Sequence, residues 1–428
     1  MSIKNNFPSV GPSLSLNFAR SKILDPRITF SRTSVGTYTD GNGLIVTGSA
    51  DEPRFDHEYE NGVVKSLGLL VEEQRTNLVT NNEDLSQWSP NSNPTLNSND
   101  TVSPDGNTTA DKVIQTNQVY TGVTTEMSGI TTNTVYSCSV FIKPDGDTTT
   151  RFGFYDTSNW QGSLDTDWSS GEPSTNGSLG GASDIVYEEY PNGWYRASFK
   201  ASTQSNAFAG TVSFHCHPDR TGTGKSAWFW GAQLEAGNFE TSYIPTSGST
   251  LTRTADNVTM TGTNFSDWYN QEQGTMIWIG NVYSKELSPV HPFRINRTDG
   301  GNLRGMGIQF DTRSVSNTVN FMSRTQSSNI PSKVGPTGVI PSDNKIKIAG
   351  GYIESVGLST LRGAFNGLPA ASYSGSSQTD VVDGAMNELE IMHNRGVSGS
   401  NIQFTGVCEQ LVYYPKIFTD TQLQNLTK

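Results

Sequence analysis

Short runs of β-forming residues, each ended by a turn signal, recur along the whole chain. In the segment 226–245, Trp228 and Trp230 alternate with Phe229, and Pro245 ends the run. A period of two places successive side chains on opposite faces, as in a strand with one buried face. Thr, Ser, Asn and 43 glycines fill the spaces between such runs and supply frequent turns. The sequence therefore predicts an all-β chain of antiparallel sandwiches.

The length of the chain indicates how many domains to expect, and its charge indicates which partners are excluded. At 428 residues it exceeds the usual size of one domain, so two or three are expected. A net charge of −12 without any Lys/Arg run argues against nucleic acid, because phosphate binding needs a basic face. No run approaches the roughly 18 to 20 apolar residues of a membrane span. The N-terminus also lacks the apolar core of a signal peptide. We therefore expect neither a nucleic-acid nor a membrane partner.

Three widely spaced cysteines, Cys138, Cys216 and Cys408, suggest a protein assembled in a cytoplasm. This odd, sparse set is no disulfide framework and fits no zinc spacing. Alternation in the run 135–142 places Cys138 on a core-facing side. We expect reduced, buried thiols.

Turn signals and composition divide the chain into three pieces. Residues 1–80 form a small β-rich region, residues 81–250 a first jelly roll and residues 251–428 a second. The prediction is two tandem antiparallel jelly-roll sandwiches behind a small N-terminal region, with one short helix at the C-terminus. That helix is signalled by Thr419 and Gln422, which form a capping box.

The N-terminal region contains a hairpin signal and several charge pairs. Residues 40–43 read Asp-Gly-Asn-Gly between β-formers, which is typical of a hairpin turn. Its arginines lie among acidic residues, so we expect internal salt bridges rather than an active site; the set is Arg27, Arg32, Arg54, Arg75, Asp25, Asp51, Asp56, Glu72 and Glu73. A region this small is marginal alone, and we expect it to pack on the next module or on a larger particle.

Short strings in all three pieces resemble parts of bacteriophage virion proteins. ITFSRTSVGTYTDGNGLI, EPRFDHE and GLLVEEQRTNL are similar to an N-terminal region of phage tail and head-fibre proteins. YSCSVFIKP, GWYRASFKAS and GAQLEAG resemble a jelly roll of the carbohydrate-binding-module type, and GAQLEAGNFETSYIPT resembles its closing strand in virion proteins. GTMIWIG, FNG and LVYYPKIFTDTQLQNL resemble a concanavalin A/laminin-G-like jelly roll. The resemblance implies a phage appendage with outward-facing β-modules.

One cluster is a candidate for catalysis. Glu388 and Glu390 share a strand face, and His393 follows them. Some glycosidases of the concanavalin-like fold carry E-x-D-x-x-E on such a strand for acid and nucleophile roles. Two of those three positions differ here, so the resemblance transfers no catalysis, and we expect no enzyme.

A second cluster is a candidate for metal binding. On a strand, His215 and His217 would face one way and Cys216 the other. Asp219 is the one further ligand nearby, whereas metal sites normally need three or four. A strand edge with two polar histidines and a buried thiol is the simpler interpretation.

Ligand-binding residues are expected in the loops of the middle piece. Trp160 and Trp168 lie in a Ser/Gly/Asp-rich stretch without core periodicity, so exposed rings could stack on sugar rings; loop packing is the alternative. Asp145 and Asp147 lie in an acidic turn that could hold calcium, since calcium prefers clustered oxygens. Turn formation alone is the other interpretation, and no cofactor is required.

The sequence thus favours a fibre- or spike-type adhesin of a phage particle. We expect the N-terminal region to contact tail or capsid proteins and the modules to bind host-surface polysaccharide. A homo-oligomer, such as a trimer, would strengthen weak sites by avidity. The expected location is the virion, assembled in the host cytoplasm and released by lysis. A decoration or head-fibre protein without sugar binding, and a polysaccharide-degrading tailspike, are the alternatives.

Overall fold

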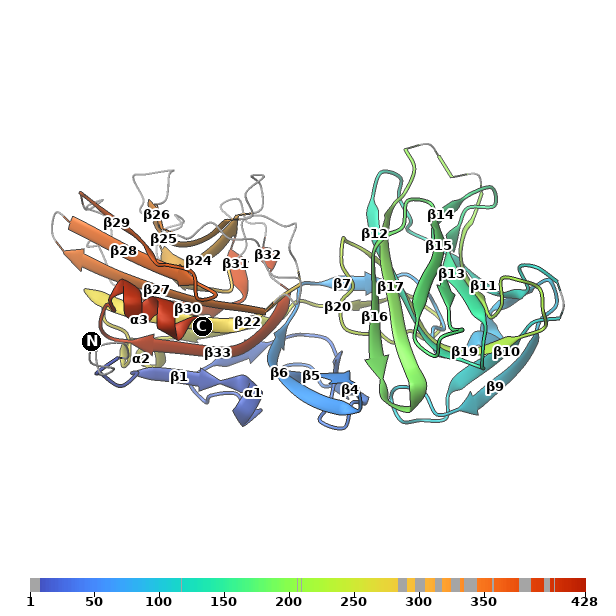
Figure 1. The fold of residues 1–428 in the computed structure, drawn as a ribbon, viewed down its shortest axis with the longest axis horizontal. Coiled ribbons are helices and arrows are strands. Elements are labelled where there is room, and N and C mark those ends of the chain that lie inside the picture. The colour runs from blue at the N-terminus through green and yellow to red at the C-terminus, as the bar shows by residue number, and fades with distance from the viewer. Residues whose placement is uncertain are drawn as a thin grey trace.

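The computed structural model describes residues 8–116, 118–205, 207–208, 210–283, 291–296, 305–311, 318–324, 332–334, 345–355, 358–376, 386–395, 401–403 and 405–428. They form two lobes (Figure 1), here called the body and the middle module. Nearly all regular structure is antiparallel β, which confirms the predicted all-β class. Within the described residues, no helix is long and apolar enough to cross a membrane.

The middle module is a sandwich of two six-stranded sheets. The inner sheet, so called because its free edge faces the body, has the order β16 (Ser183–Tyr190), β17 (Trp194–Ser202), β12 (Val135–Pro144), β19 (Ser226–Ala236), β10 (Ala110–Ile114) and β9 (Thr95–Thr101). The outer sheet has the order β15 (Ser174–Leu179), β14 (Trp160–Asp167), β13 (Thr149–Tyr155), β18 (Val212–His217), β11 (Gly122–Met127) and β8 (Ser89–Asn91). Apolar side chains from both sheets form one buried core between them.

The body is a second sandwich, with a larger core of its own. Its first sheet has the order β29 (Ala371–Ser376), β28 (Leu358–Phe365), β27 (Lys345–Ser355), β22 (Gln273–Val282), β33 (Gly406–Tyr414), β6 (Val63–Val71) and β5 (Arg54–Glu60), and β1 (Leu14–Asn17) also pairs with β33. Its second sheet has the order β2 (Thr29–Ser31), β21 (Asn257–Thr261), β30 (Glu388–Ile391), β23 (Phe293–Asn296), β24 (Gly305–Asp311), β25 (Thr318–Arg324) and β26 (Ser332–Val334).

Smaller elements complete the chain. Three two-stranded ribbons pair β3 (Gly36–Thr39) with β4 (Ile45–Gly48), β7 (Arg75–Asn77) with β20 (Leu251–Arg253), and β31 (His393–Arg395) with β32 (Asn401–Gln403). The helices are α1 (Phe18–Ser21), α2 (Thr263–Ser266) and α3 (Asp420–Leu426). Thr419 and Gln422 form the predicted capping box at the start of α3, so the short C-terminal helix is confirmed.

The N-terminal strands belong to the same sandwich as the C-terminal strands. β5 and β6 extend the sheet beside β33, and β2 pairs with β21 in the other sheet. In Figure 1 the blue N-terminal strands accordingly lie beside the red β33. The N-terminal region, expected to pack on the next module or on a larger particle, is instead part of the sandwich formed by the C-terminal piece. The chain leaves the body through β7, forms the middle module, and returns through β20.

The aromatic stretch that ends the middle module serves the junction between the lobes as well as the module core. Phe229 faces the core, as alternation predicts, but Trp230 lies on the opposite sheet face in a buried cluster with Phe141 and Tyr243. Gly231, at φ +63°, allows this packing, because a Cβ there would lie only 2.9 Å from the Phe141 ring. Ile45 of the body joins the same cluster. Alternation predicted a buried face on this strand; Trp230 is buried, but in the cluster at the junction and not in the core between the two sheets.

A buried charge network connects the segments of the body. Arg54 donates to Glu72 at 2.6 Å and to Asp256 at 2.6 Å, and Arg32 donates to Asp256 at 3.0 Å. Ser242, at the end of the middle module, also donates its backbone N–H to Glu72 at 2.7 Å. Three ion pairs within the set expected for the N-terminal region are present: Arg27 with Asp25, Arg54 with Glu72 and Arg75 with Glu73. Asp256, from a distant part of the sequence, completes the network.

The charge of Glu72 is stabilised by its cationic neighbours. Burial alone would raise the pKa of this carboxyl, but the guanidinium groups of Arg253 and Arg54 outweigh it and lower the pKa to about 2. A carboxylate with a lowered pKa stabilises the fold above its unfolded pKa, and this contribution is lost as pH falls towards 2.

Replacing Glu72 by Gln is expected to destabilise the protein by about 3 to 5 kcal/mol, because it leaves buried guanidinium charge without its partner. Urea unfolding at pH 7 measures the loss. Glu272→Gln, at an exposed position of the body, is the control and should change the free energy of unfolding by less than about 0.5 kcal/mol. Equal effects of the two variants would contradict a stabilising role for the network.

Candidate functional site

The exposed face of the outer sheet carries a cluster of aromatic and polar side chains. Along β13 and β18 the core-facing residues are Phe152, Phe154 and Phe214, so the residues between them point away from the core. The members of this outer-face cluster are Tyr120, Arg151, Tyr155, Trp160, Asp165, His215 and His217. They come from β13, β14, β18 and the segment before β11.

Trp160 lies at the centre of this cluster. Its half-buried ring is 5.3 Å from the ring of Tyr155 and 5.3 Å from that of His215, measured between centroids. The Arg151 guanidinium carbon lies 5.3 Å from the Trp160 ring centroid. Tyr120, which is 51% exposed, forms the outer edge of the cluster. Part of the Trp160 ring is therefore accessible to solvent, and its neighbours cover the remainder.

The base of the cluster is a buried ion pair between adjacent strands. Arg151 and Asp165 face each other in the β13–β14 register and bind through two contacts, of 2.5 and 2.8 Å. Arg220 approaches the same carboxylate at 3.2 Å. With its two oxygens already occupied by guanidinium groups, Asp165 fixes the platform rather than offering a free charge.

The histidines give the cluster neutral hydrogen-bonding groups. Burial, with a smaller effect of the neighbouring ring, lowers the pKa of His215 to about 3, and burial lowers that of His217 to about 4. Both are thus uncharged at neutral pH. Within the described residues, Nδ1 of His215 and the buried Oγ of Ser163 have no hydrogen-bond partner. Ser163 lies on the same face of β14 as Asp165. Both atoms are buried, so the accessible part of the cluster is the Tyr120 ring and part of the Trp160 ring.

Trp168 does not share this exposure. It is 2% exposed, its Nε1 donates to Thr150 Oγ1 at 2.9 Å, and its ring lies against Tyr195. The exposure expected for Trp168 is therefore wrong, because the residue folds back onto the sheet once β14 has ended. Of the two predicted platform residues, only Trp160 has an accessible ring.

The acidic turn predicted to hold calcium lies at another place on the middle module. Asp145 pairs with Lys112 at 2.8 Å, and Asp147 lies 3.7 Å from Lys225. Within the described residues, no group of three or more His, Cys, Asp and Glu side chains is arranged to hold a metal ion. Calcium binding by Asp145 and Asp147 stays a prediction.

The residues around Cys216 that were considered as candidate metal ligands fit the simpler interpretation of a strand with a buried thiol. His215 and His217 stack with ring centroids 5.5 Å apart, and Cys216 is buried on the other face, as alternation predicts. Asp219 instead accepts hydrogen bonds from Thr221 and Thr223, and so orders its own loop.

The carboxylates considered for catalysis are enclosed within the body. Glu388 is 3% exposed and Glu390 is completely buried, on β30 in the middle of a sheet. Asn296 of the adjacent β23 donates its side-chain amide to Glu390 at 2.5 Å. The side chain of His393 lies outside the described residues.

Several members of the outer-face cluster were absent from the residues predicted from sequence. Arg151 and Tyr155 alternate with Phe152 and Phe154, so the period of two in this run carried the signal. The partner Asp165 could not be chosen from sequence, because its position depends on the register between β13 and β14.

Comparison with known proteins gives similarity at low levels only. No protein-family model and no curated protein matches the sequence. The CBM40 module of the Ruminococcus gnavus IT-sialidase, solved with alpha2,3 sialyllactose, is 14% identical, with a TM-score of 0.30, and the match covers 37% of this chain and 84% of that chain. Domains LG4-5 of the mouse laminin alpha1 chain are 9% identical, with a TM-score of 0.24 and coverage of 72% and 90%. Both are β-sandwich types. Such values give no basis for transferring a ligand or an activity.

The two tryptophans are expected to differ in their effect on stability. Trp168→Ala removes a fully enclosed ring and should cost about 3 to 5 kcal/mol, whereas Trp160→Ala, at a half-buried position, should cost clearly less. Denaturant unfolding followed by circular dichroism compares them. Equal losses would contradict the different burial of the two rings.

Proposed function

We propose that this protein is a bacteriophage appendage of the fibre or spike type, and that its middle module binds host-surface glycan through the outer-face cluster. One observation carries the glycan part. The partly accessible Trp160 ring lies beside the neutral His215, and Arg151 and His217 contact both Trp160 and the exposed Tyr120.

Sugar chemistry matches this set of groups. A pyranose ring has an apolar face that packs on an aromatic ring, and its hydroxyls both donate and accept hydrogen bonds. Tyr120 and Trp160 would provide the ring surface, and His215 a polar contact. Since Asp165 is already saturated by Arg151 and Arg220, the proposed ligand is a neutral rather than a strongly charged sugar.

The virion part of the proposal rests on the resemblance of the short sequence strings to phage tail and head-fibre proteins. Individual sites on such appendages would bind weakly and gain strength from many copies. An acidic surface would keep densely displayed copies soluble. The proposed role is binding without catalysis, to which the enclosed positions of Glu388 and Glu390 lend support.

A glycan array probed with the intact chain tests the sugar site. Trp160→Ala should reduce binding to the recognised neutral glycan at least tenfold, while circular dichroism stays unchanged. Trp228→Ala, which removes a partly buried tryptophan of the opposite sheet, is the matched control and should bind as the wild type does. Wild-type binding by the Trp160 variant would refute this site, and no binding to any glycan would favour a purely structural role.

The location is tested separately from the ligand. Antibody labelling of purified phage particles in electron micrographs should place the protein on the particle surface, at the tail or the head. Absence of the protein from intact particles would refute the virion assignment even if the glycan site proved correct.

A further inference from the structure

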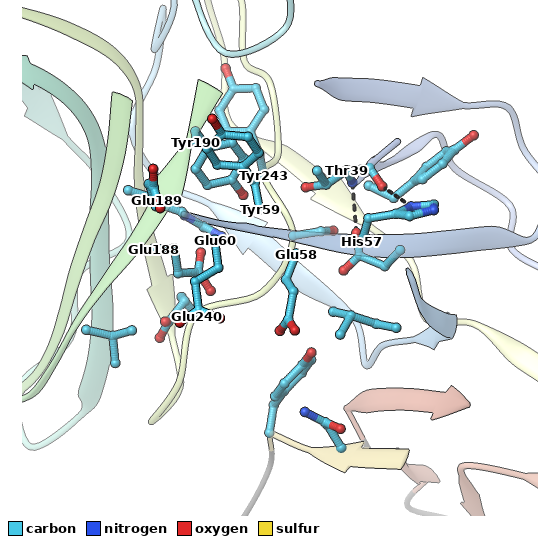
Figure 2. A pocket seen from close by; sticks show the side chains of 18 of the residues that line it. Thr39, His57, Glu58, Tyr59, Glu60, Glu188, Glu189, Tyr190, Glu240 and Tyr243 are labelled. Atoms are coloured by element: carbon cyan, nitrogen blue, oxygen red, sulfur yellow. Dashed lines mark hydrogen bonds between the residues drawn. The ribbon is translucent and has the colours of Figure 1, made fainter. Parts of the chain in front are cut away.

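A cavity of about 890 Å³ lies between the body and the middle module (Figure 2). The body contributes β5 and β6 to its walls, and the middle module contributes β16, β17 and the segment 238–243. The cavity is therefore an interface feature, whose shape depends on how the two lobes are placed.

Two edge strands face this cavity. β5 ends one sheet of the body and β16 ends the inner sheet of the middle module, so each has an unpaired side. Asn61, just after β5, donates its backbone N–H to the Glu189 carboxylate on β16 at 2.7 Å. Edge strands that approach each other can pair, and charged side chains normally prevent this. The two edges are thus close enough to interact while remaining separate.

The charges along this cavity are strongly unbalanced. Ten of its lining side chains are carboxylates and only four are lysine or arginine. Three of those cations are paired: Lys65 with Glu58, Lys200 with Asp184 and Lys345 with Glu409. Glu72 is also paired, with Arg54 behind the cavity wall, so these ion pairs account for four of the ten carboxylates.

Glu188 of β16 is the carboxylate most affected. Its side chain is exposed on the wall of the cavity, and desolvation by the protein around the cavity raises its pKa to about 7. Arg196, opposite it on β17, acts against the rise. The negative charges of Glu240 in the middle module and of Asp56 and Glu58 on β5 add to it.

Asp56 is the corresponding carboxylate on the body. It accepts a hydrogen bond from the backbone N–H of Thr39 at 2.8 Å. Burial raises its pKa to about 6; the backbone N–H groups of Thr39 and His57 and the charge of Arg54 oppose the rise, and the charge of Glu72 adds to it. Carboxylates of both lobes thus share one enclosed space.

We propose that this cavity is an acid-stabilised junction, in which ionisation of Glu188 and Asp56 loosens the docking of the middle module on the body and their protonation tightens it. The physical reason is like charge across the gap between two edge strands, with too few cations to compensate it. The opposed edges would separate slightly at higher pH to admit water, while the buried contacts beside β7 and β20 keep the lobes attached.

The sign follows from the direction of both shifts. A carboxyl whose pKa is raised in the folded state binds its proton more tightly there than in the unfolded chain. Docking is therefore strongest below about pH 4, where both groups are protonated, and weakens as the pH rises through about 6 and 7. Glu72 behaves in the opposite way. Its pKa is lowered in the folded state, so its contribution to the free energy of unfolding is lost only in strong acid.

Hydrogen exchange of the intact chain between pH 5 and pH 8, corrected for intrinsic exchange rates, tests the proposal. From pH 5 to pH 8, the protection of peptides covering β5 and β16 should fall about tenfold. A pKa shift of one unit changes an equilibrium constant by about this factor. Peptides from β22, in the middle of a body sheet, should not change.

Glu188→Gln and Asp56→Asn keep the size of each side chain and remove its charge. Each should reduce the pH dependence of protection, and the double variant should abolish it while remaining folded. Glu272→Gln is the control and should keep the wild-type dependence. Protection that is independent of pH in the wild type, or a full dependence retained in the double variant, would overturn the proposal. Either result leaves the glycan site unaffected.

Discussion

The buried network of Arg32, Arg54, Glu72 and Asp256 is the constraint on which the architecture depends. Its members come from both sides of the inserted middle module, and their charges are removed from water almost completely. Isolated charges at such depth would be very costly, so each segment is stable there only when the other is present. The network therefore favours a single sandwich that contains both the N-terminal and the C-terminal strands. Ser242, at the end of the middle module, donates to Glu72 and so connects that module to the network.

The two contact regions between the lobes have opposite physical character. Around Trp230, Phe141 and Tyr243 the junction is apolar and closely packed, with ring centroids 4.6 to 6.0 Å apart. The cavity beside β5 and β16 is open, acidic and poor in cations. One side of the junction is therefore held by apolar packing, whereas the other contains Asp56 and Glu188, the carboxyl groups whose pKa values are raised. Under the proposed pH dependence, the middle module would change its docking while the apolar contacts keep it attached to the body.

Local sequence patterns predicted part of the fold. The alternation of side chains along a strand and the preference of certain residues for turns and caps depend only on a few neighbouring residues. The Asp-Gly-Asn-Gly hairpin, the core position of Cys138 and the capping box of α3 all follow from such short-range rules. Trp168 shows their limit. Its polar, aperiodic surroundings suggested exposure, yet the chain turns it back under Tyr195. Trp160 has equally polar neighbours, and only the register of β13, β14 and β18 distinguishes the two.

The sequence by itself determined the all-β class, strands such as β12 and β19, the buried cysteines and the net negative charge, because composition and local alternation decide these properties. Only the tertiary structure decided that the middle module is inserted into one sandwich, that Asp256 meets Arg54, and that Glu188 and Asp56 line the same cavity. Arg54 and Asp256 are 202 residues apart in the sequence. Asp56 and Glu188 belong to different lobes. Long-range strand pairing brings them together, and nothing in the residues near either partner encodes which distant strand will be its neighbour.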